Sequence, residues 1–174
     1  MAKKGLLIVN TGNGKGKTTA ALGLALRMLG HGKRVSIIQF IKGSWKCGEL
    51  EAAKKFSGLL DFHVLGRGFT FDSNDNSADT EAARAAWLFA ERTISEGLHD
   101  LVILDELTYL VKLNMVDEEL ILKTLVNKPP KMHVLVTGRY ATEKLMDVAD
   151  LVTEMKEVKH PLKTGIKAQR GIEF

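Results

Sequence analysis

The fold of this chain is constrained most by a run rich in glycine and lysine, Thr-Gly-Asn-Gly-Lys-Gly-Lys-Thr-Thr, at residues 11–19. An aliphatic stretch at 6–10 precedes the run and predicts a strand, and an Ala- and Leu-rich stretch at 17–29 predicts a helix that ends at Gly30. A glycine-rich turn between a strand and a helix is the context in which P-loops bind phosphate. The run therefore predicts a P-loop, and this context disfavours the alternative of a turn without a ligand.

The residue types of this turn suit phosphate. Glycines permit unusual backbone angles, so several N–H groups can converge on one anion, and the positive end of the following helix points at the same place. Lys17 can neutralise phosphate charge, and the Thr18 hydroxyl can ligate Mg²⁺. The usual spacing, Gly-x4-Gly-Lys-Ser/Thr, would need glycine where Thr11 stands, and a second lysine, Lys15, is present. This departure leaves open a phosphate orientation different from that in ordinary kinases and ATPases.

Short apolar runs alternate with longer amphipathic stretches along the rest of the chain. We expect further strands at 34–40, 62–65, 101–104, 133–137 and 151–155, further helices at 49–56, 78–96, 118–126 and 142–148, and a polar loop at 66–77. The alternation predicts an α/β fold, a single P-loop NTPase-like (RecA-type) domain whose mainly parallel central sheet of about six strands is flanked by helices. The pattern does not give the order of the strands.

Composition narrows the class of protein. Hydrophobic residues make up 45% and charged residues 26%, as in soluble globular proteins. The single cysteine, Cys47, cannot form an internal disulfide, so we expect a cytoplasmic protein. The apolar runs are far shorter than the roughly 20 residues that a membrane span needs, and no membrane partner is expected. The net charge of +4 is mild, and the basic tail lacks interleaved aromatic residues, so we expect no nucleic-acid partner either.

A second element at 101–106, Leu-Val-Ile-Leu-Asp-Glu, is a hydrophobic strand that ends in two carboxylates. The carboxyl ends of strands in open α/β sheets border the ligand crevice. Asp105 or Glu106 could therefore hold Mg²⁺ directly or through water. The alternative is that Asp105 merely caps the following turn. Together with the P-loop, the element predicts a magnesium-nucleotide site, which fits a kinase, a motor ATPase or an adenosyltransferase.

Further segments narrow this choice. They are Thr-Gly-Asn-Gly-Lys-Gly-Lys-Thr-Thr-Ala-Ala at 11–21, Gly-His-Gly-Lys at 30–33, Gln-Phe-Ile-Lys-Gly at 39–43, Trp45, Gly48-Glu49, Gly68-Phe69-Thr70, Leu-Asp-Glu-Leu-Thr-Tyr at 104–109, Thr-Gly-Arg at 137–139, Ala149-Asp150, Val158-Lys159-His160 and Gly-x-Lys-Ala-Gln-x-Gly-Ile-Glu at 165–173. Through these runs, in order and over nearly its whole length, the chain resembles the P-loop ATP:corrinoid adenosyltransferases, which act on cob(I)alamin or cob(I)yrinic acid a,c-diamide. The resemblance implies that residues 1–174 form one domain of this family.

The resemblance implies a reaction between ATP and a reduced corrinoid. In that family the cobalt(I) centre attacks C5′ of the ribose, a cobalt–carbon bond forms and tripolyphosphate leaves, in adenosylcobalamin biosynthesis or salvage. ATP lies in the P-loop in reverse relative to kinases, which agrees with the altered loop spacing. Because cobalt(I) is itself a strong nucleophile, the protein supplies positioning and charge stabilisation rather than a base.

The resemblance also assigns roles to residues. The residues expected to bind ATP are Gly12, Asn13, Gly14, Lys15, Gly16, Lys17, Thr18, Thr19, Arg27 and Arg139. The expected ligands of Mg²⁺ or Mn²⁺ are Thr18 and Glu106, with Asp105 close by. Lys17 and Glu106 are also expected to act in catalysis, together with Phe69 and Phe71.

The two phenylalanines are expected to cover the lower face of the corrin ring. By excluding the lower axial ligand they would make cobalt(II) easier to reduce. Phe71 stands where many members carry tryptophan, and the alternative for both residues is a small surface cluster that pins their loop.

The resemblance further implies a homodimer and a flavoprotein reductant such as flavodoxin. Longer members carry an N-terminal extension that helps to cover the site, whereas the first strand predicted here begins almost at once. Two other classes stay open. A P-loop small-molecule kinase would release ADP, and a non-catalytic ATP-binding sensor would bind ATP without turnover.

Overall fold

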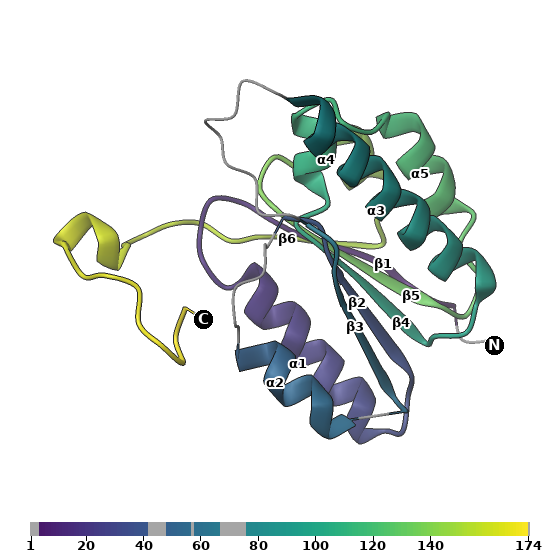
Figure 1. Cartoon of the computed structure of the whole chain (residues 1–174), viewed down its shortest axis with the longest axis horizontal. Coiled ribbons are helices and arrows are strands. Elements are labelled where there is room, and N and C mark those ends of the chain that lie inside the picture. Colours follow the sequence, from purple (N-terminus) through teal and green to yellow (C-terminus); the bar gives the residue numbers. More distant parts are fainter. Residues whose placement is uncertain (1–3, 42–47, 57, 67–75, 174) are drawn as a thin grey trace.

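The computed structural model describes residues 4–41, 48–56, 58–66 and 76–173 (Figure 1). Six strands form one sheet in the order β3-β2-β4-β5-β1-β6, and every neighbouring pair is parallel. The strands are β1 (Leu7–Thr11), β2 (Val35–Gln39), β3 (Leu60–Val64), β4 (Leu101–Asp105), β5 (His133–Thr137) and β6 (Leu151–Glu154). The helices are α1 (Lys17–Gly30), α2 (Gly48–Ala53), α3 (Asn76–Glu96), α4 (Thr108–Lys112), α5 (Glu118–Val126) and α6 (Glu143–Val148), with 3₁₀ turns η1 (Lys54–Phe56) and η2 (Pro161–Thr164).

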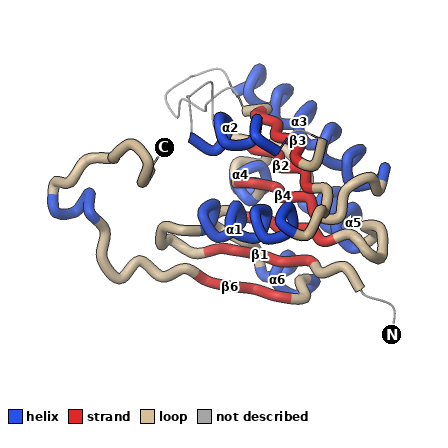
Figure 2. The backbone as a smooth tube through the Cα atoms, turned by 90° about the horizontal axis from the view of Figure 1, so that it is seen from below, coloured by secondary structure: helices blue, strands red, loops and turns tan. Residues whose placement is uncertain are grey.

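Helices cover both faces of the sheet, with α1 and α2 on one face and α3, α4 and α5 on the other (Figures 1 and 2). Successive side chains of a strand point to opposite faces, so each strand contributes to two separate cores. On β4, for example, Ile103 packs in the core under α1, whereas Val102 and Leu104 pack in the core under α3 and α5. This two-sided burial explains why the strands read as continuous apolar runs.

The sequence-based fold prediction is confirmed, with differences at the ends of some elements. The strand expected at 62–65 begins two residues earlier, and the helix expected at 49–56 is α2 followed by the 3₁₀ turn η1. Helix α4 was not predicted, because it is only five residues long and rich in β-branched and aromatic residues, which are weak helix formers. Burial of Leu107 and Leu110 beneath it holds this turn in place. None of the helices that the structure describes is long and apolar enough to cross a lipid bilayer.

Parallel pairing brings the carboxyl ends of β1, β4 and β5 to one edge of the sheet. The P-loop follows β1, the acidic pair Asp105 and Glu106 ends β4, and the turn at 138–140 follows β5. Beyond β6 the chain leaves the sheet, passes through η2 and returns toward the start of α1 (Figure 1). The functional segments predicted from the sequence therefore gather at this edge, together with a tail that comes from the other end of the chain.

The turn after β5 is packed tightly against α4. Gly138 has φ of 143°, and a Cβ atom there would lie 2.1 Å from Thr108 Oγ1. That same Thr108 hydroxyl donates a hydrogen bond to the carbonyl of Arg139. Glycine at 138 thus lets α4 fix the backbone that carries Arg139.

We expect Gly138→Ala to destabilise the fold by about 1–3 kcal/mol, because the new methyl group must displace Thr108 and α4. The matched control is Gly23→Ala, at a position of α1 where a Cβ would meet nothing within 4 Å. There alanine should stabilise by about 0.5–1 kcal/mol, since glycine costs more backbone entropy in a helix. Urea unfolding of both variants measures the difference, and equal midpoints for the two would contradict this packing.

Candidate nucleotide site

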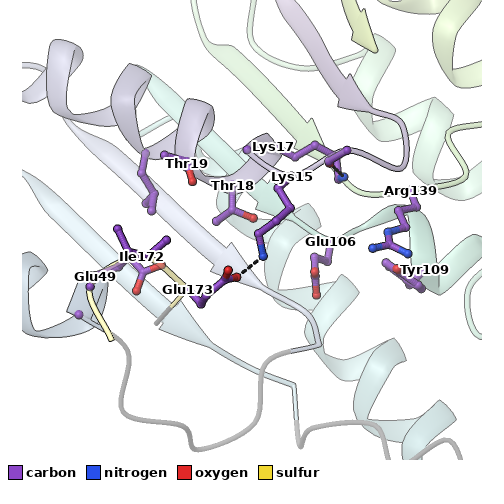
Figure 3. Close-up of a pocket in the computed structure, with 15 residues that line it drawn as sticks. Lys15, Lys17, Thr18, Thr19, Glu49, Glu106, Tyr109, Arg139, Ile172 and Glu173 are labelled. Atoms are coloured by element: carbon purple, nitrogen blue, oxygen red, sulfur yellow. Dashed lines mark hydrogen bonds and ion pairs between the residues drawn. The ribbon is translucent and has the colours of Figure 1, made fainter. Parts of the chain in front are cut away.

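A pocket of about 510 Å³ lies at the carboxyl edge of the sheet, over the N-terminus of α1 (Figure 3). Parts of the chain that are far apart in sequence line it: the P-loop with the start of α1, the start of α2, the segments that follow β4 and β5, and the C-terminal tail. The lining residues are Gly14, Lys15, Gly16, Lys17, Thr18, Thr19, Leu22, Gly48, Glu49, Glu106, Tyr109, Arg139, Gly171, Ile172 and Glu173.

The P-loop is shaped by glycines and by the segment that follows β6. Gly12 and Gly16 have φ of 91° and 106°, a region that side chains disfavour. Gly14 N donates to the carbonyl of Met155 at 2.6 Å, and a Cβ on Gly12 would lie only 2.5 Å from the same oxygen. The loop is therefore held by its own backbone conformation and by close packing on Met155.

Lys17 lies across the loop that precedes it. Its Nζ donates to the carbonyls of Gly12 and Gly14, each at 2.7 Å. Burial lowers the pKa of Lys17, and the charge of Arg139 lowers it further, whereas Glu106 and Asp105 oppose the shift. The ammonium is thus already positioned on the loop, beside a second cation.

Asp105 lies behind the pocket and is 1% exposed. Its Oδ1 accepts hydrogen bonds from Thr18 Oγ1 at 2.8 Å and from Thr137 Oγ1 at 2.7 Å, and its Oδ2 accepts from Gln39 Nε2 at 2.9 Å. This carboxylate is therefore linked to the P-loop, β2 and β5 at once. The side chains that donate to Asp105 come from these elements, so Asp105 joins them to one another and does more than cap the turn after β4.

Glu106 is directly exposed to the pocket. Its φ of 63° turns the chain sharply at the end of β4, and its backbone N–H donates to Thr137 Oγ1 at 2.9 Å. The turn brings its carboxylate to the side of the pocket that Arg139 and Tyr109 also line (Figure 3). Burial and the nearby Glu106 and Tyr140 raise the pKa of Tyr109, against the lowering effect of Arg139.

The C-terminal tail contributes to the same pocket. Glu173 forms an ion pair with Lys15, and Gly171 and Ile172 complete that side of the lining (Figure 3). The sequence analysis noted only that this tail is basic and lacks interleaved aromatic residues. The signal that could have indicated more was the run at 165–173, which belongs to the family pattern and ends in a carboxylate.

Most of the residues predicted to bind ATP or metal meet in or directly beneath this pocket. Asn13 instead lines a smaller adjoining hollow of about 390 Å³, which Arg139 shares. The structure does not bring Arg27 to the pocket: this residue is exposed in the last turn of α1, and about ten residues of helix place it about 15 Å along the axis from Lys17. Its contact with a nucleotide stays a prediction. Phe69, Phe71, Trp45 and Cys47 lie outside the described residues.

The donor set at the pocket fits a magnesium ion that is bound together with phosphates. Mg²⁺ is usually held by one or two protein oxygens and completed by substrate phosphates and water, rather than by a cage of side chains. Thr18 and Glu106 offer such oxygens at the pocket lining. In the described part of the chain no group of three or more His, Cys, Asp or Glu side chains could hold a metal ion. The geometry therefore suits a cation that arrives with a nucleotide.

Solved structures of similar shape identify the fold. The flagellar accessory protein FlaH from Methanocaldococcus jannaschii superposes with a TM-score of 0.57 at 15% identity, covering 87% of this chain and 71% of FlaH. The cytoplasmic domain of EssC gives 0.53 at 16% identity, covering 95% and 34%. At these identities the likeness shows the fold alone, and it confirms the P-loop NTPase-like architecture.

Sequence comparisons identify the family. A sequence model described as "ATP:corrinoid adenosyltransferase BtuR/CobO/CobP" matches residues 3–174. The corrinoid adenosyltransferase of Sinorhizobium sp. is 44% identical over 99% of this chain and 81% of its own length. Those of Escherichia coli K12 and of Salmonella typhimurium LT2, the latter named CobA, are each 42% identical over 99% of this chain and 87% of theirs. The resemblance seen in the sequence is confirmed, and the chain belongs to the ATP:corrinoid adenosyltransferase family.

Proposed function

We propose that this protein transfers the 5′-deoxyadenosyl group of ATP to the cobalt(I) of a reduced corrinoid and releases tripolyphosphate, in adenosylcobalamin biosynthesis or salvage. One observation carries the proposal. The P-loop pocket gathers Lys15, Lys17, Thr18 and Glu106 in a chain that matches the family along almost its whole length. On this proposal, residues 1–174 act as a single adenosyltransferase domain.

The work of the protein in this reaction is to position ATP and to stabilise the leaving group. The nucleophile belongs to the corrinoid substrate, so no side chain has to remove a proton. Negative charge grows on the departing tripolyphosphate, and preorganised cations and N–H groups act most strongly where charge develops. Lys15, Lys17, Arg139 and the amides of the P-loop are the groups proposed to receive it.

Lys17 is suited to this role by its starting position. Its ammonium bonds to the carbonyls of Gly12 and Gly14, so it is held on the loop rather than free in solvent. A phosphate oxygen placed among the loop amides comes within reach of the same ammonium by a small movement of the side chain. Little conformational entropy remains to be lost when the phosphate binds.

The proposed metal ligands are the Thr18 hydroxyl and the Glu106 carboxylate. Thr18 donates its only hydroxyl proton to Asp105, so its oxygen lone pairs remain for a cation. Asp105, with both of its oxygens taken by protein donors, acts behind Thr18 rather than as a ligand itself. A bound Mg²⁺ or Mn²⁺ would offset the charge of the triphosphate.

The corrinoid is proposed to approach from the side of β3. The backbone N–H groups of Leu65 and Gly66 both donate to the carbonyl of Gln39, at the carboxyl edge of the sheet. Gly66 is the last described residue before the segment that carries Phe69 and Phe71, and it lies at the same edge of the sheet as the P-loop. The two phenylalanines themselves lie outside the described residues, and the resemblance supports their proposed role under the corrin ring.

We also propose that the protein is a cytoplasmic homodimer that receives electrons from a flavoprotein such as flavodoxin. The tail after β6 supports self-association, because it exposes apolar side chains to solvent. Val158 is 89% exposed and Leu162 68%.

The transferase reaction is tested anaerobically with Mg-ATP and chemically reduced cob(I)alamin. We expect adenosylcobalamin in the visible spectrum and tripolyphosphate as the phosphate product. Lys17→Ala should reduce the rate by about 10²-fold or more, because it removes a charge aimed at the leaving group. The matched control is Lys33→Ala, an exposed lysine paired with Asp100, which should keep the rate within about twofold.

A different product would redirect the assignment. Release of ADP would place the protein among kinases or ATPases. ATP binding without any product would make it a sensor. Equal rates for Lys17→Ala and Lys33→Ala would remove the P-loop from the mechanism.

Metal removal gives a second test. With excess EDTA the transfer should slow by at least about tenfold, and Mg²⁺ or Mn²⁺ added beyond the chelator should restore it. In Glu106→Gln the metal concentration for half-maximal rate should rise by about tenfold or more, because the amide is a weaker ligand than the carboxylate. A rate indifferent to EDTA would exclude the proposed metal site.

A further inference from the structure

Thr137 was not predicted as a site residue, yet it lies at the centre of the hydrogen bonds behind the pocket. It is the last residue of β5 and has no exposed surface. Its hydroxyl donates to Asp105 Oδ1 at 2.7 Å and accepts from the backbone N–H of Glu106 at 2.9 Å. A hydroxyl has one proton to give, so the two bonds run in a fixed direction from Glu106 through Thr137 to Asp105.

The same carboxylate oxygen accepts the hydroxyl of Thr18. Asp105 Oδ1 is thus shared by Thr18 at 2.8 Å and Thr137 at 2.7 Å, while Gln39 holds the other oxygen. A continuous path of hydrogen bonds joins the P-loop hydroxyl to the backbone of Glu106. Its two ends are the two residues proposed to hold the metal.

The backbone conformation of Glu106 requires support from such hydrogen bonds. Its φ of 63° belongs to the left-handed region, which residues other than glycine, asparagine and aspartate seldom adopt. Such conformations persist only where their surroundings determine them, and they concentrate at functional sites. The bond from Glu106 N–H to the Thr137 hydroxyl fixes the peptide that turns this carboxylate into the pocket.

We propose that Thr137 is a positioning residue of the metal–ATP site. Its hydroxyl couples Asp105 to the backbone of Glu106 and so fixes the spacing between the oxygens of Glu106 and Thr18. The inference rests on the proposed metal site at these two residues. Thr137 acts through its neighbours and lies one layer behind the pocket that they line.

The decisive variant is Thr137→Val, which keeps the shape of the side chain and removes the hydroxyl. We expect the dissociation constant of Mn²⁺ in the presence of ATP to rise about 10–100-fold, as is usual when a group that orients metal ligands is lost. The dissociation constant of ATP in EDTA should stay within about twofold, because the loop amides and Lys17 are untouched. Electron paramagnetic resonance of free Mn²⁺ and titration calorimetry give the two constants.

Two further variants separate positioning from general damage. Thr137→Ser keeps the hydroxyl and should restore Mn²⁺ binding to within about threefold of the unmodified protein. Thr93→Val places valine at another buried threonine, whose hydroxyl bonds to the carbonyl of Phe89 within α3, and should leave both constants unchanged. If Thr137→Val does not fold, Thr137→Ala makes the same test.

Several results would overturn the proposal. They are unchanged Mn²⁺ binding in Thr137→Val, an equal loss of ATP binding with and without metal, and a serine variant as weak as the valine variant. If the unmodified protein bound ATP without retaining Mn²⁺, the positioning role and the metal site would fail together. Because both constants are measured without corrinoid, the result is independent of whether adenosyl transfer occurs.

Discussion

The buried carboxylate of Asp105 is the interaction on which the rest of the site depends. A charge so deeply removed from water is tolerated only when hydrogen bonds replace its hydration. Here the donors come from the start of α1, from β2 and from β5, so satisfying one side chain fixes the relative positions of three elements. The P-loop is thereby bound to the sheet through Thr18, the second residue of α1. The relative positions of the residues that line the pocket therefore depend on the buried Asp105 carboxylate rather than on residues that face solvent.

Around that centre the sheet provides a rigid frame. Its two cores hold the strands from both faces, and the parallel order carries the functional turns to a single edge. Residues with positive φ lie at this edge, among them Gly12, Gly16, Glu106 and Gly138. Regular, buried elements thus support strained turns, which is the usual division between scaffold and site in α/β proteins.

The parts of the fold that could be predicted were those with local causes. The P-loop, its helix and the acidic end of β4 each depend on residues adjacent in sequence, and all were found correctly. The strand order, the packing of Gly138 on Thr108 and the role of Thr137 depend on pairing between distant segments, which a single sequence does not reveal. The place of Arg27 likewise follows from the course of α1, which begins at the site and carries its later residues away from it.

The place of β6 has a consequence for how the protein is made. The strand β1 is paired on one side with β5 and on the other with β6, the last strand in the part of the chain that the structure describes. The loop that follows β1 rests on Met155, just beyond β6. Such distant pairing is slow to form, because a long loop must close first. During synthesis, therefore, β1 stays unpaired on one side until β6 has been translated, and the loop that follows β1 lacks its contact with Met155 until then.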